Sequence, residues 1–255
     1  MHAAATGTGP PKRYLVYEKA IGKKGVWIAD ADGSNQRLLV RDARNPAISP
    51  DGASVAYVGG CSAEDICKGT YVISTAGGKP RRISSDRLTF PPAAFTWSPD
   101  SKRLLLTRGS TPFEGELVSI DVADGSTSTI AKGRLYGTSF SPDGQQIVYS
   151  KATPATPRSG KDALDLFVVP SDGGKPKRIT HTGDNAASVW GPKAIAFSRV
   201  VWKDSWGRNE IWRIEPDGSG RETITGPCRT SSICRDPMDW SRSDGPTTVA
   251  SCSAA

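Results

Sequence analysis

Five cysteines have the spacing that bears most directly on chemistry. Cys61 and Cys67 lie six residues apart, as do Cys228 and Cys234, and Cys252 is left over. Neither gap matches the spacing of zinc-binding cysteines, and the chain has only two histidines. Two local disulfides, Cys61–Cys67 and Cys228–Cys234, are the favoured interpretation. They predict an oxidising, extracytoplasmic location, periplasmic or secreted. The alternative is five unpaired thiols in a cytosolic protein.

Patterns typical of catalysis are weakly represented. The chain has no Gly-x-Ser-x-Gly elbow and no glycine-rich phosphate loop, and a triad would have to use His181, since His2 lies at the terminus. The turn DADGSN at 30–35 offers oxygens of the kind that calcium takes, but Arg41 stands where a calcium loop needs glutamate. A hairpin turn is preferred there. We expect no catalytic residue, no metal site and no cofactor, with calcium as the minor alternative.

Composition excludes further classes. The 255 residues carry a net charge of +7, and 23% of them are charged, with both signs mixed. No apolar run approaches 18 residues, so no membrane span is expected. The basic residues are scattered rather than striped, which makes nucleic acid an improbable partner. The first residues have neither a cationic start nor an apolar core, so we expect no signal peptide within this chain.

An internal repeat determines the expected architecture. Ser-Pro-Asp recurs in AISPDG at 47–52, TWSPDS at 96–101 and SFSPDG at 139–144, and degenerate copies follow at 189–193 and 239–245. The serines and their equivalents are separated by 49, 43, 50 and 50 residues. A period of 40–50 residues built from short strands is typical of β-propellers.

Each repeat carries the same strand signals. A short apolar run follows the Ser-Pro-Asp turn, and a longer run with alternating β-branched and aromatic residues comes next. No stretch shows a helical period. These patterns predict strands at 55–58, 71–75, 104–107, 117–121, 147–150, 166–170, 195–198 and 211–215, after opening strands at 14–17 and 26–30.

These repeats resemble those of the TolB-like β-propellers, relatives of the WD-type repeats. The resemblance is carried by Ser-Pro-Asp after an aromatic residue (Trp97, Phe140 and, in degenerate form, Trp240) and by the DADGSN turn, and it covers roughly residues 13–250. It implies a single all-β propeller of four-stranded blades. The spacing favours five blades, although TolB-like rings more often have six. A six-bladed ring and an incomplete ring are the alternatives.

The phase of the repeat predicts how the ring closes. The chain begins in a second-type strand at 14–17 and carries a first-type strand, MDWS, at 238–241. These N- and C-terminal strands are expected to complete one blade, which removes the free sheet edges. We expect a disordered leader at 1–12, the propeller at 13–251 and a tail at 252–255.

Loops that share one face of the propeller, among them 199–209, are expected to bind a partner, because loops rather than strands usually carry function. Exposed aromatic residues mixed with arginine are typical of contact surfaces. The opposing interpretation is that Trp202 and Trp206 simply pack against neighbouring blades. The candidate binding residues are Phe90, Tyr136, Arg199, Trp202, Lys203, Trp206, Arg208 and Arg235.

The resemblance implies an interaction scaffold of the cell envelope. We therefore expect a monomeric, non-enzymatic binding module that presents this basic and aromatic face to a protein or an acidic polymer. The alternative is a metal-dependent lyase or hydrolase acting on an anionic carbohydrate, because some related propellers are lyases.

Overall fold

The computed structural model describes residues 13–60, 67–85, 95–111, 114–153, 163–203 and 206–225, with the backbone alone at 110, 111, 114, 201–203 and 206–208. One compact unit spans Met1–Ile224. A second unit, Thr225–Ala255, is described only at Thr225. Of the candidate binding residues, Phe90 and Arg235 therefore lie outside the described residues, as does the predicted strand at 238–241.

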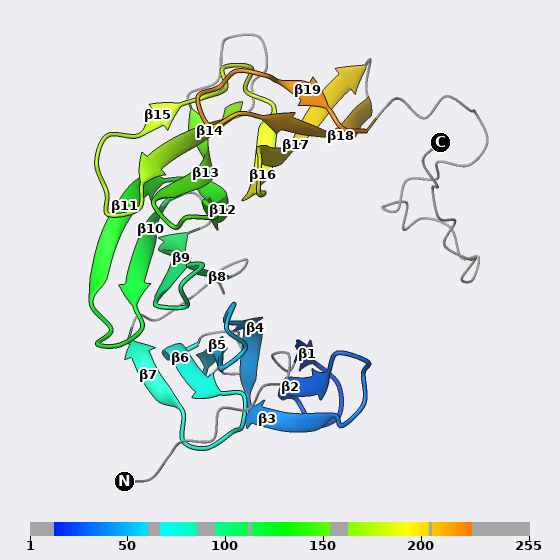
Figure 1. The fold of residues 1–255 in the computed structure, drawn as a ribbon, viewed down its shortest axis with the longest axis vertical. Helices are drawn as coiled ribbons and strands as arrows, with labels where there is room; N and C mark the ends of the chain where they lie inside the picture. Colours follow the sequence, from blue (N-terminus) through cyan, green and yellow to red (C-terminus); the bar gives the residue numbers. More distant parts are fainter. Residues whose placement is uncertain are drawn as a thin grey trace, which may run out of the picture. The chain divides into compact units, whose positions relative to one another are not determined.

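The described residues form five antiparallel sheets and no helix (Figure 1). Four sheets have four strands each, whereas the first has three. In sheet order the strands are β1 (Tyr14–Lys19), β2 (Gly25–Asp30) and β3 (Arg37–Arg41); β4 (Ala43–Ile48), β5 (Ser54–Gly59), β6 (Gly69–Ser74) and β7 (Arg81–Ser84); β8 (Thr96–Trp97), β9 (Arg103–Thr111), β10 (Glu114–Asp121) and β11 (Thr127–Gly133); β12 (Leu135–Phe140), β13 (Gln146–Thr153), β14 (Ala163–Pro170) and β15 (Lys177–Arg178); β16 (Asn185–Trp190), β17 (Ile195–Lys203), β18 (Trp206–Ile214) and β19 (Glu222–Thr223).

The predicted all-β architecture is confirmed, because every predicted strand within these residues is present. The loop predicted at 199–209 is much shorter than expected, because β17 continues to Lys203 and β18 begins at Trp206. Val200 and Val201 suit an extended backbone and pair with Asn209 and Arg208 across a two-stranded ribbon.

The Ser-Pro-Asp turns are built identically in the three intact repeats. In the second, the Ser98 hydroxyl donates to Asp100 Oδ1 at 2.5 Å and accepts from the backbone N–H of Arg103 at 2.8 Å. Ser49 and Ser141 make the equivalent bonds in their own turns. The hydroxyl therefore ties the turn to the first residue of the following strand.

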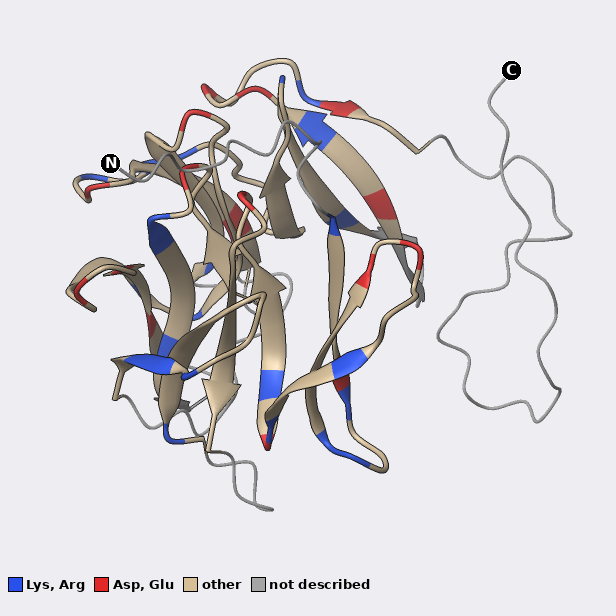
Figure 2. Cartoon of the chain, turned by 60° about the horizontal axis from the view of Figure 1, so that its bottom comes forward, with Lys and Arg blue, Asp and Glu red and all other residues tan. Residues whose placement is uncertain are grey.

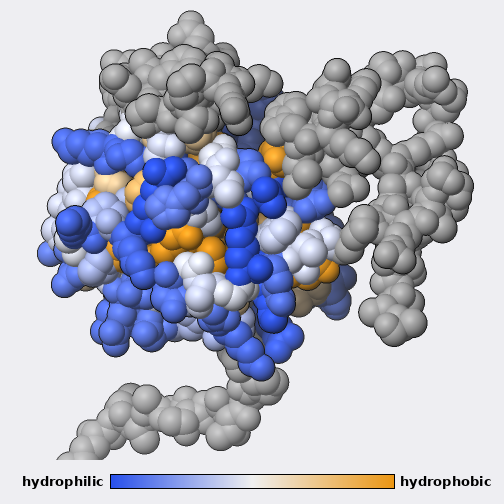
Figure 3. All heavy atoms as spheres, turned by 90° about the horizontal axis from the view of Figure 1, so that it is seen from above, coloured by the Kyte–Doolittle hydropathy of each residue, from blue (hydrophilic) through white to orange (hydrophobic). Residues whose placement is uncertain are grey.

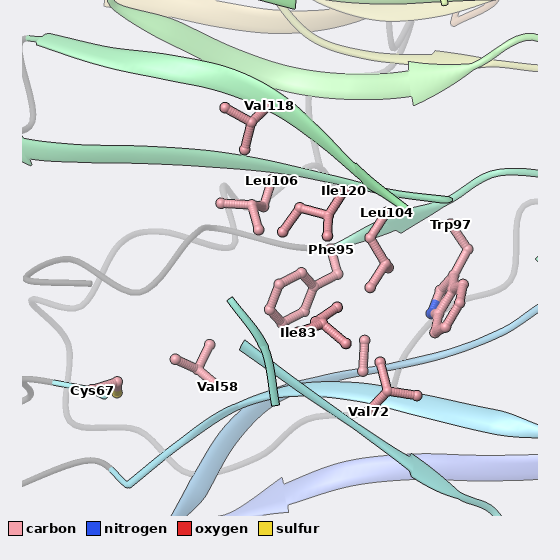
Figure 4. Packing of buried hydrophobic residues seen from close by; sticks show 11 residues of the cluster. Val58, Cys67, Val72, Ile83, Phe95, Trp97, Leu104, Leu106, Val118 and Ile120 are labelled. Atoms are coloured by element: carbon pink, nitrogen blue, oxygen red, sulfur yellow. The ribbon is translucent and has the colours of Figure 1, made fainter. Parts of the chain in front are cut away.

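Two adjacent strands of each sheet carry a pair of residues at the same repeat position, which we call the core pair; the strands are β1 and β2, β5 and β6, β9 and β10, β13 and β14, and β17 and β18. At this repeat position the pair is aromatic in four sheets: Tyr17–Trp27, Tyr57–Tyr71, Tyr149–Phe167 and Phe197–Trp212. In the β8–β11 sheet it is aliphatic, Leu106 and Val118. Both side chains join a cluster with Val58, Val72 and Ile83 of the preceding sheet (Figure 4).

A bulge recurs near the start of the innermost strands. Asn45, Gly137 and Ala187 occupy it with φ of 50°, 45° and 45°. The register of each strand shifts at this point. At Gly137 a Cβ would lie 2.6 Å from the Cα of Ala187, so only glycine fits against the neighbouring strand.

Candidate functional site

The register places the starts of the innermost strands beside the ends of the second strands. Leu135 pairs with Lys151, and Asn185 pairs with Arg199. We call this the loop end of a sheet. The Ser-Pro-Asp turns lie at the opposite end, which we call the turn end.

One cation stands at the same repeat position of four sheets, close to the loop end. Along β1, β9, β13 and β17, this cation comes two residues after the member of the core pair on the same strand. We call this set of residues, Lys19, Arg108, Lys151 and Arg199, the cation tier. Three of the cations face an acidic residue on the third strand: Arg108 faces Glu116, Lys151 faces Asp165 and Arg199 faces Glu210.

The first cation of the tier has an aromatic neighbour instead of an acid. Lys19 faces Gly25, and its Nζ lies 3.8 Å from the centroid of the Trp27 ring and 5.6 Å from that of Tyr17. This is the geometry of a cation–π contact. The loop end of this sheet therefore combines a positive charge with two aromatic rings.

Ion pairing is explicit in the β8–β11 sheet. Glu116 accepts from Lys132 at 2.7 Å and from Arg108 at 3.1 Å. These two cations, Lys132 first, hold the pKa of the Glu116 carboxyl below its usual range. Glu116 is therefore ionised at neutral pH and shared between two basic groups.

A buried polar network connects the β12–β15 and β16–β19 sheets. Asp165 is fully buried, and its Oδ1 accepts from Thr180 at 2.8 Å, Asn185 at 3.2 Å and the backbone of Gly183 at 3.2 Å. Its Oδ2 pairs with Arg178 at 2.5 Å. These hydrogen bonds hold Asn185 against Asp165, so the network fixes the beginning of β16.

Two arginines flank one indole above this network. The guanidinium carbons of Arg199 and Arg221 lie 4.9 Å and 5.1 Å from the centroid of the Trp212 ring. Arg199 Nε donates to Asp184 Oδ2 at 2.7 Å, and Arg221 Nη2 donates to Asn185 Oδ1 at 2.9 Å. Burial lowers the pKa of Arg221, and the neighbouring Arg199 lowers it further.

The structure describes the predicted binding residues other than Phe90 and Arg235. Arg199 belongs to the arginine pair, and Tyr136 lies on β12, where its hydroxyl is 2.5 Å from Arg134 Nε. Trp202, Lys203, Trp206 and Arg208 lie on the β17–β18 ribbon, in which Lys203 pairs with Trp206. The ribbon extends the loop end of the sheet that carries the arginine pair.

Arg221 and Trp212 belong to the candidate site but were not among the predicted binding residues. A signal for Arg221 was present, because it occupies the position of Pro80 and Pro176 in the aligned GGKP turns. Trp212 lies within the strand predicted at 211–215. Its contribution as a platform for two guanidinium groups depends on the fold.

Charge on the described surface is mixed rather than concentrated. Basic and acidic residues are interspersed over the strands and turns (Figure 2), and hydrophilic residues predominate on the face drawn in Figure 3. Among the described residues, no three His, Cys, Asp or Glu side chains are grouped so that they could hold a metal ion. None of these residues forms a membrane-spanning helix.

The four-stranded sheets and the repeated Ser-Pro-Asp turns define the class of this protein as a β-propeller. Its sequence matches the TolB beta propeller domain family over residues 13–233, and the chain belongs to that family.

Curated relatives match only part of their length. The chain is 32% identical over 99 residues to dipeptidyl-peptidase 5 of Porphyromonas endodontalis, which covers 38% of this chain and 14% of that protein. It is 30% identical over 147 residues to an uncharacterised protein of Agrobacterium fabrum, covering 57% and 45% respectively. The chain therefore spans less than half the length of either relative.

Solved structures of different activities share the fold. A putative TolB from Agrobacterium tumefaciens matches with a TM-score of 0.59 and 20% identity, covering 85% of this chain and 82% of that one. An oligogalacturonate lyase from Vibrio parahaemolyticus matches with a TM-score of 0.62 and 13% identity, covering 83% and 61%. At these identities the likeness shows the fold alone, so binding or catalysis must be argued from the site.

Proposed function

We propose that this protein is a non-enzymatic, monomeric binding module of the cell envelope or secreted fraction. Its loop ends bind a protein or an acidic polymer through basic and aromatic side chains. The cation tier is the observation that carries the proposal. The repeat supplies a cation beside the loop end in four sheets, and the β17–β18 ribbon adds Trp202, Trp206 and Arg208.

The binding test compares the two ends of the sheets. A triple variant, Trp202→Ala, Trp206→Ala and Arg208→Ala, is expected to lose partners captured from an envelope extract and to lose retention on polygalacturonate or polyglutamate. The matched control replaces Lys79 and Lys175, exposed residues of the aligned turns at the turn end, with alanine. Unchanged binding by the triple variant would show that the ribbon is not part of the binding surface.

The extracytoplasmic location rests on the cysteines. Cys67 is fully buried and disulfide-bonded, which supports the Cys61–Cys67 pair. Cys228 and Cys234 lie outside the described residues, so their pairing stays a prediction. Mass spectrometry after alkylation of the unreduced protein should find one labelled cysteine, Cys252. Five labelled cysteines would refute the two disulfides and the location inferred from them.

A second candidate function follows from the likeness to the lyase. The loop ends would then hold an anionic carbohydrate that is cleaved with the help of a metal ion. The test incubates the protein with oligogalacturonate and manganese and follows the absorbance of unsaturated products. We expect binding without product; product that depends on both the protein and manganese would favour the enzyme.

A further inference from the structure

Arg221 occupies a repeat position that does not require arginine. Proline fills this position in two of the aligned turns, at Pro80 and Pro176, and Gln36 fills it after the DADGSN turn; the following strand forms in all three cases. A long charged side chain is therefore not needed for the turn. Arginine at this point of the β16–β19 sheet instead reaches Asn185 and the aromatic pair Phe197 and Trp212.

The Arg221 guanidinium is only partly satisfied. Its Nη2 donates to Asn185 Oδ1 at 2.9 Å and to Thr182 Oγ1 at 3.3 Å. Its Nε is buried and has no hydrogen-bond partner among the described residues. Because Nε is buried, a ligand from solvent would meet the Nη groups instead, and Nη1 has no hydrogen-bond partner among the described residues.

Arg199 carries a second set of N–H donors next to Arg221. Its Nε is occupied by Asp184, whereas its two Nη groups have no hydrogen-bond partner within the described part of the chain. Side-chain exposure is 25% for Arg199 and 23% for Arg221, so a small group can reach both from solvent. Both guanidinium groups contact Trp212, which restricts their orientation.

The carboxylates nearby do not fully compensate the two arginines. Asp165 is engaged by Arg178, and Glu210 accepts from the indole N–H of Trp212 at 2.9 Å. Asp184 remains, and it lies 2.7 Å from Arg199 but 3.9 Å from Arg221. The two guanidinium groups thus share the carboxylate of Asp184, and their remaining N–H groups could donate to a second carboxylate.

We propose that Arg199 and Arg221 form a subsite for a single carboxylate of an acidic side chain or C-terminus of a protein partner. The subsite deepens the proposed function and rests on it. Guanidinium groups bind carboxylates in two parallel hydrogen bonds, and the second carboxylate would accept from the unoccupied Nη groups of both arginines. Because the two arginines already share Asp184, the subsite has unoccupied donors for one further carboxylate. A single carboxylate is therefore favoured over a uronate polymer.

The experiment follows the arginine Nε–H signals of the folded protein by NMR. The probe is the tripeptide acetyl-Gly-Glu-Gly-amide, and its glutamine counterpart is the control ligand. Saturable shifts of the Arg221 and Arg199 signals with the glutamate peptide alone are expected. Arg221→Lys should raise the Kd about tenfold or more, because lysine keeps the charge but loses the fork. Arg213→Lys, on an exposed ion pair of the same sheet, should leave the Kd unchanged.

Each outcome separates the subsite from the broader proposal. Absence of a shift with the glutamate peptide, while the ribbon variants still abolish partner binding, would overturn the subsite and leave the loop-end function intact. Absence of a shift with the glutamate peptide, together with unchanged partner binding by the ribbon variants, would overturn both. Shifts produced by trigalacturonate but not by the peptide would overturn the protein source of the carboxylate.

Discussion

Replacing Ser98 with alanine tests the hydrogen-bonded turn that the intact repeats share. The hydroxyl connects Asp100 Oδ1 with the backbone N–H of Arg103, at 2.5 Å and 2.8 Å. Ser98 is completely buried, so water cannot easily take its place. The backbone bond from Ser98 N to Arg103 O, at 2.8 Å, does not involve the side chain and should persist in the variant.

The expected loss follows from two interactions. An amide left without its acceptor costs about 1–3 kcal/mol, and the bond to the carboxylate of Asp100 adds about 1 kcal/mol after screening by solvent. Because such terms are not fully additive, we expect the free energy of unfolding to fall by about 2–3 kcal/mol at pH 7. That corresponds to a decrease in Tm of about 4–12 °C for a domain of this size.

The effect should depend on pH in one direction. The Ser98 hydroxyl is the main cause that holds the pKa of Asp100 below its usual range. A carboxyl with a lowered folded pKa stabilises fully above its unfolded pKa, about 3.9, and stops doing so as the pH falls through the folded pKa. The difference between the parent and Ser98→Ala should therefore shrink from pH 5 to pH 2.

Urea unfolding followed by tryptophan fluorescence measures this difference at each pH. The control is a double-mutant cycle with Asp100→Asn, which should show a coupling of about 1 kcal/mol at pH 7. A loss that stays constant from pH 7 to pH 2, together with zero coupling, would refute the reasoning. The hydroxyl would then act through the Arg103 amide alone.

Three further predictions test the bulge, the buried tyrosines and ring closure. Gly137→Ala should cost about 3 kcal/mol or more in chemical unfolding, because the new Cβ overlaps the backbone of β16, whereas Gly22→Ala, also at positive φ but in open space, should cost only about 1 kcal/mol; similar losses would contradict this. Burial raises the pKa of Tyr57 and Tyr149 to about 12, so each contributes stability below the unfolded pKa of about 10 that is lost towards pH 12. An absorbance titration should show two tyrosines ionising late, and Tyr149→Phe should remove one of them. Deletion of residues 236–255, which removes the predicted closing strand at 238–241, should lower the Tm, whereas deletion of 252–255 should not; equal values of Tm would argue against closure by that strand.

Much of the fold could be predicted because the same pattern of turns and strands recurs several times along the chain. The Ser-Pro-Asp turn limits one end of each second strand, and alternation identifies the strand that follows. The end of β17 was harder to predict, since Trp202, Lys203, Trp206 and Arg208 resemble a loop in composition. Whether such residues extend a ribbon depends on cross-strand pairing, which a single sequence does not display.

The candidate site was predictable only where it repeats or stands out chemically. Arg199 was identified because it is basic and near aromatic residues. Its partners Asp184 and Arg221 lie 15 and 22 residues away and are brought together by the turns on either side of the β16–β19 sheet. Spacing alone could not show that Trp212 contacts both arginines, because that depends on how three strands share one face.

Departures from the repeat point to where on the propeller a partner should bind. In the β4–β7 sheet the cation position is Gly59, facing Gly69. A Cβ at Gly59 would lie 2.8 Å from the Tyr71 ring, so the stacked pair Tyr57–Tyr71 occupies the space that a cation takes elsewhere. The loop ends are therefore chemically unequal. Among the described residues, the β16–β19 sheet alone combines a tier cation, a second arginine on the same indole and an aromatic ribbon. Binding energy should therefore concentrate there, and substitutions at the β4–β7 loop end should affect a partner least.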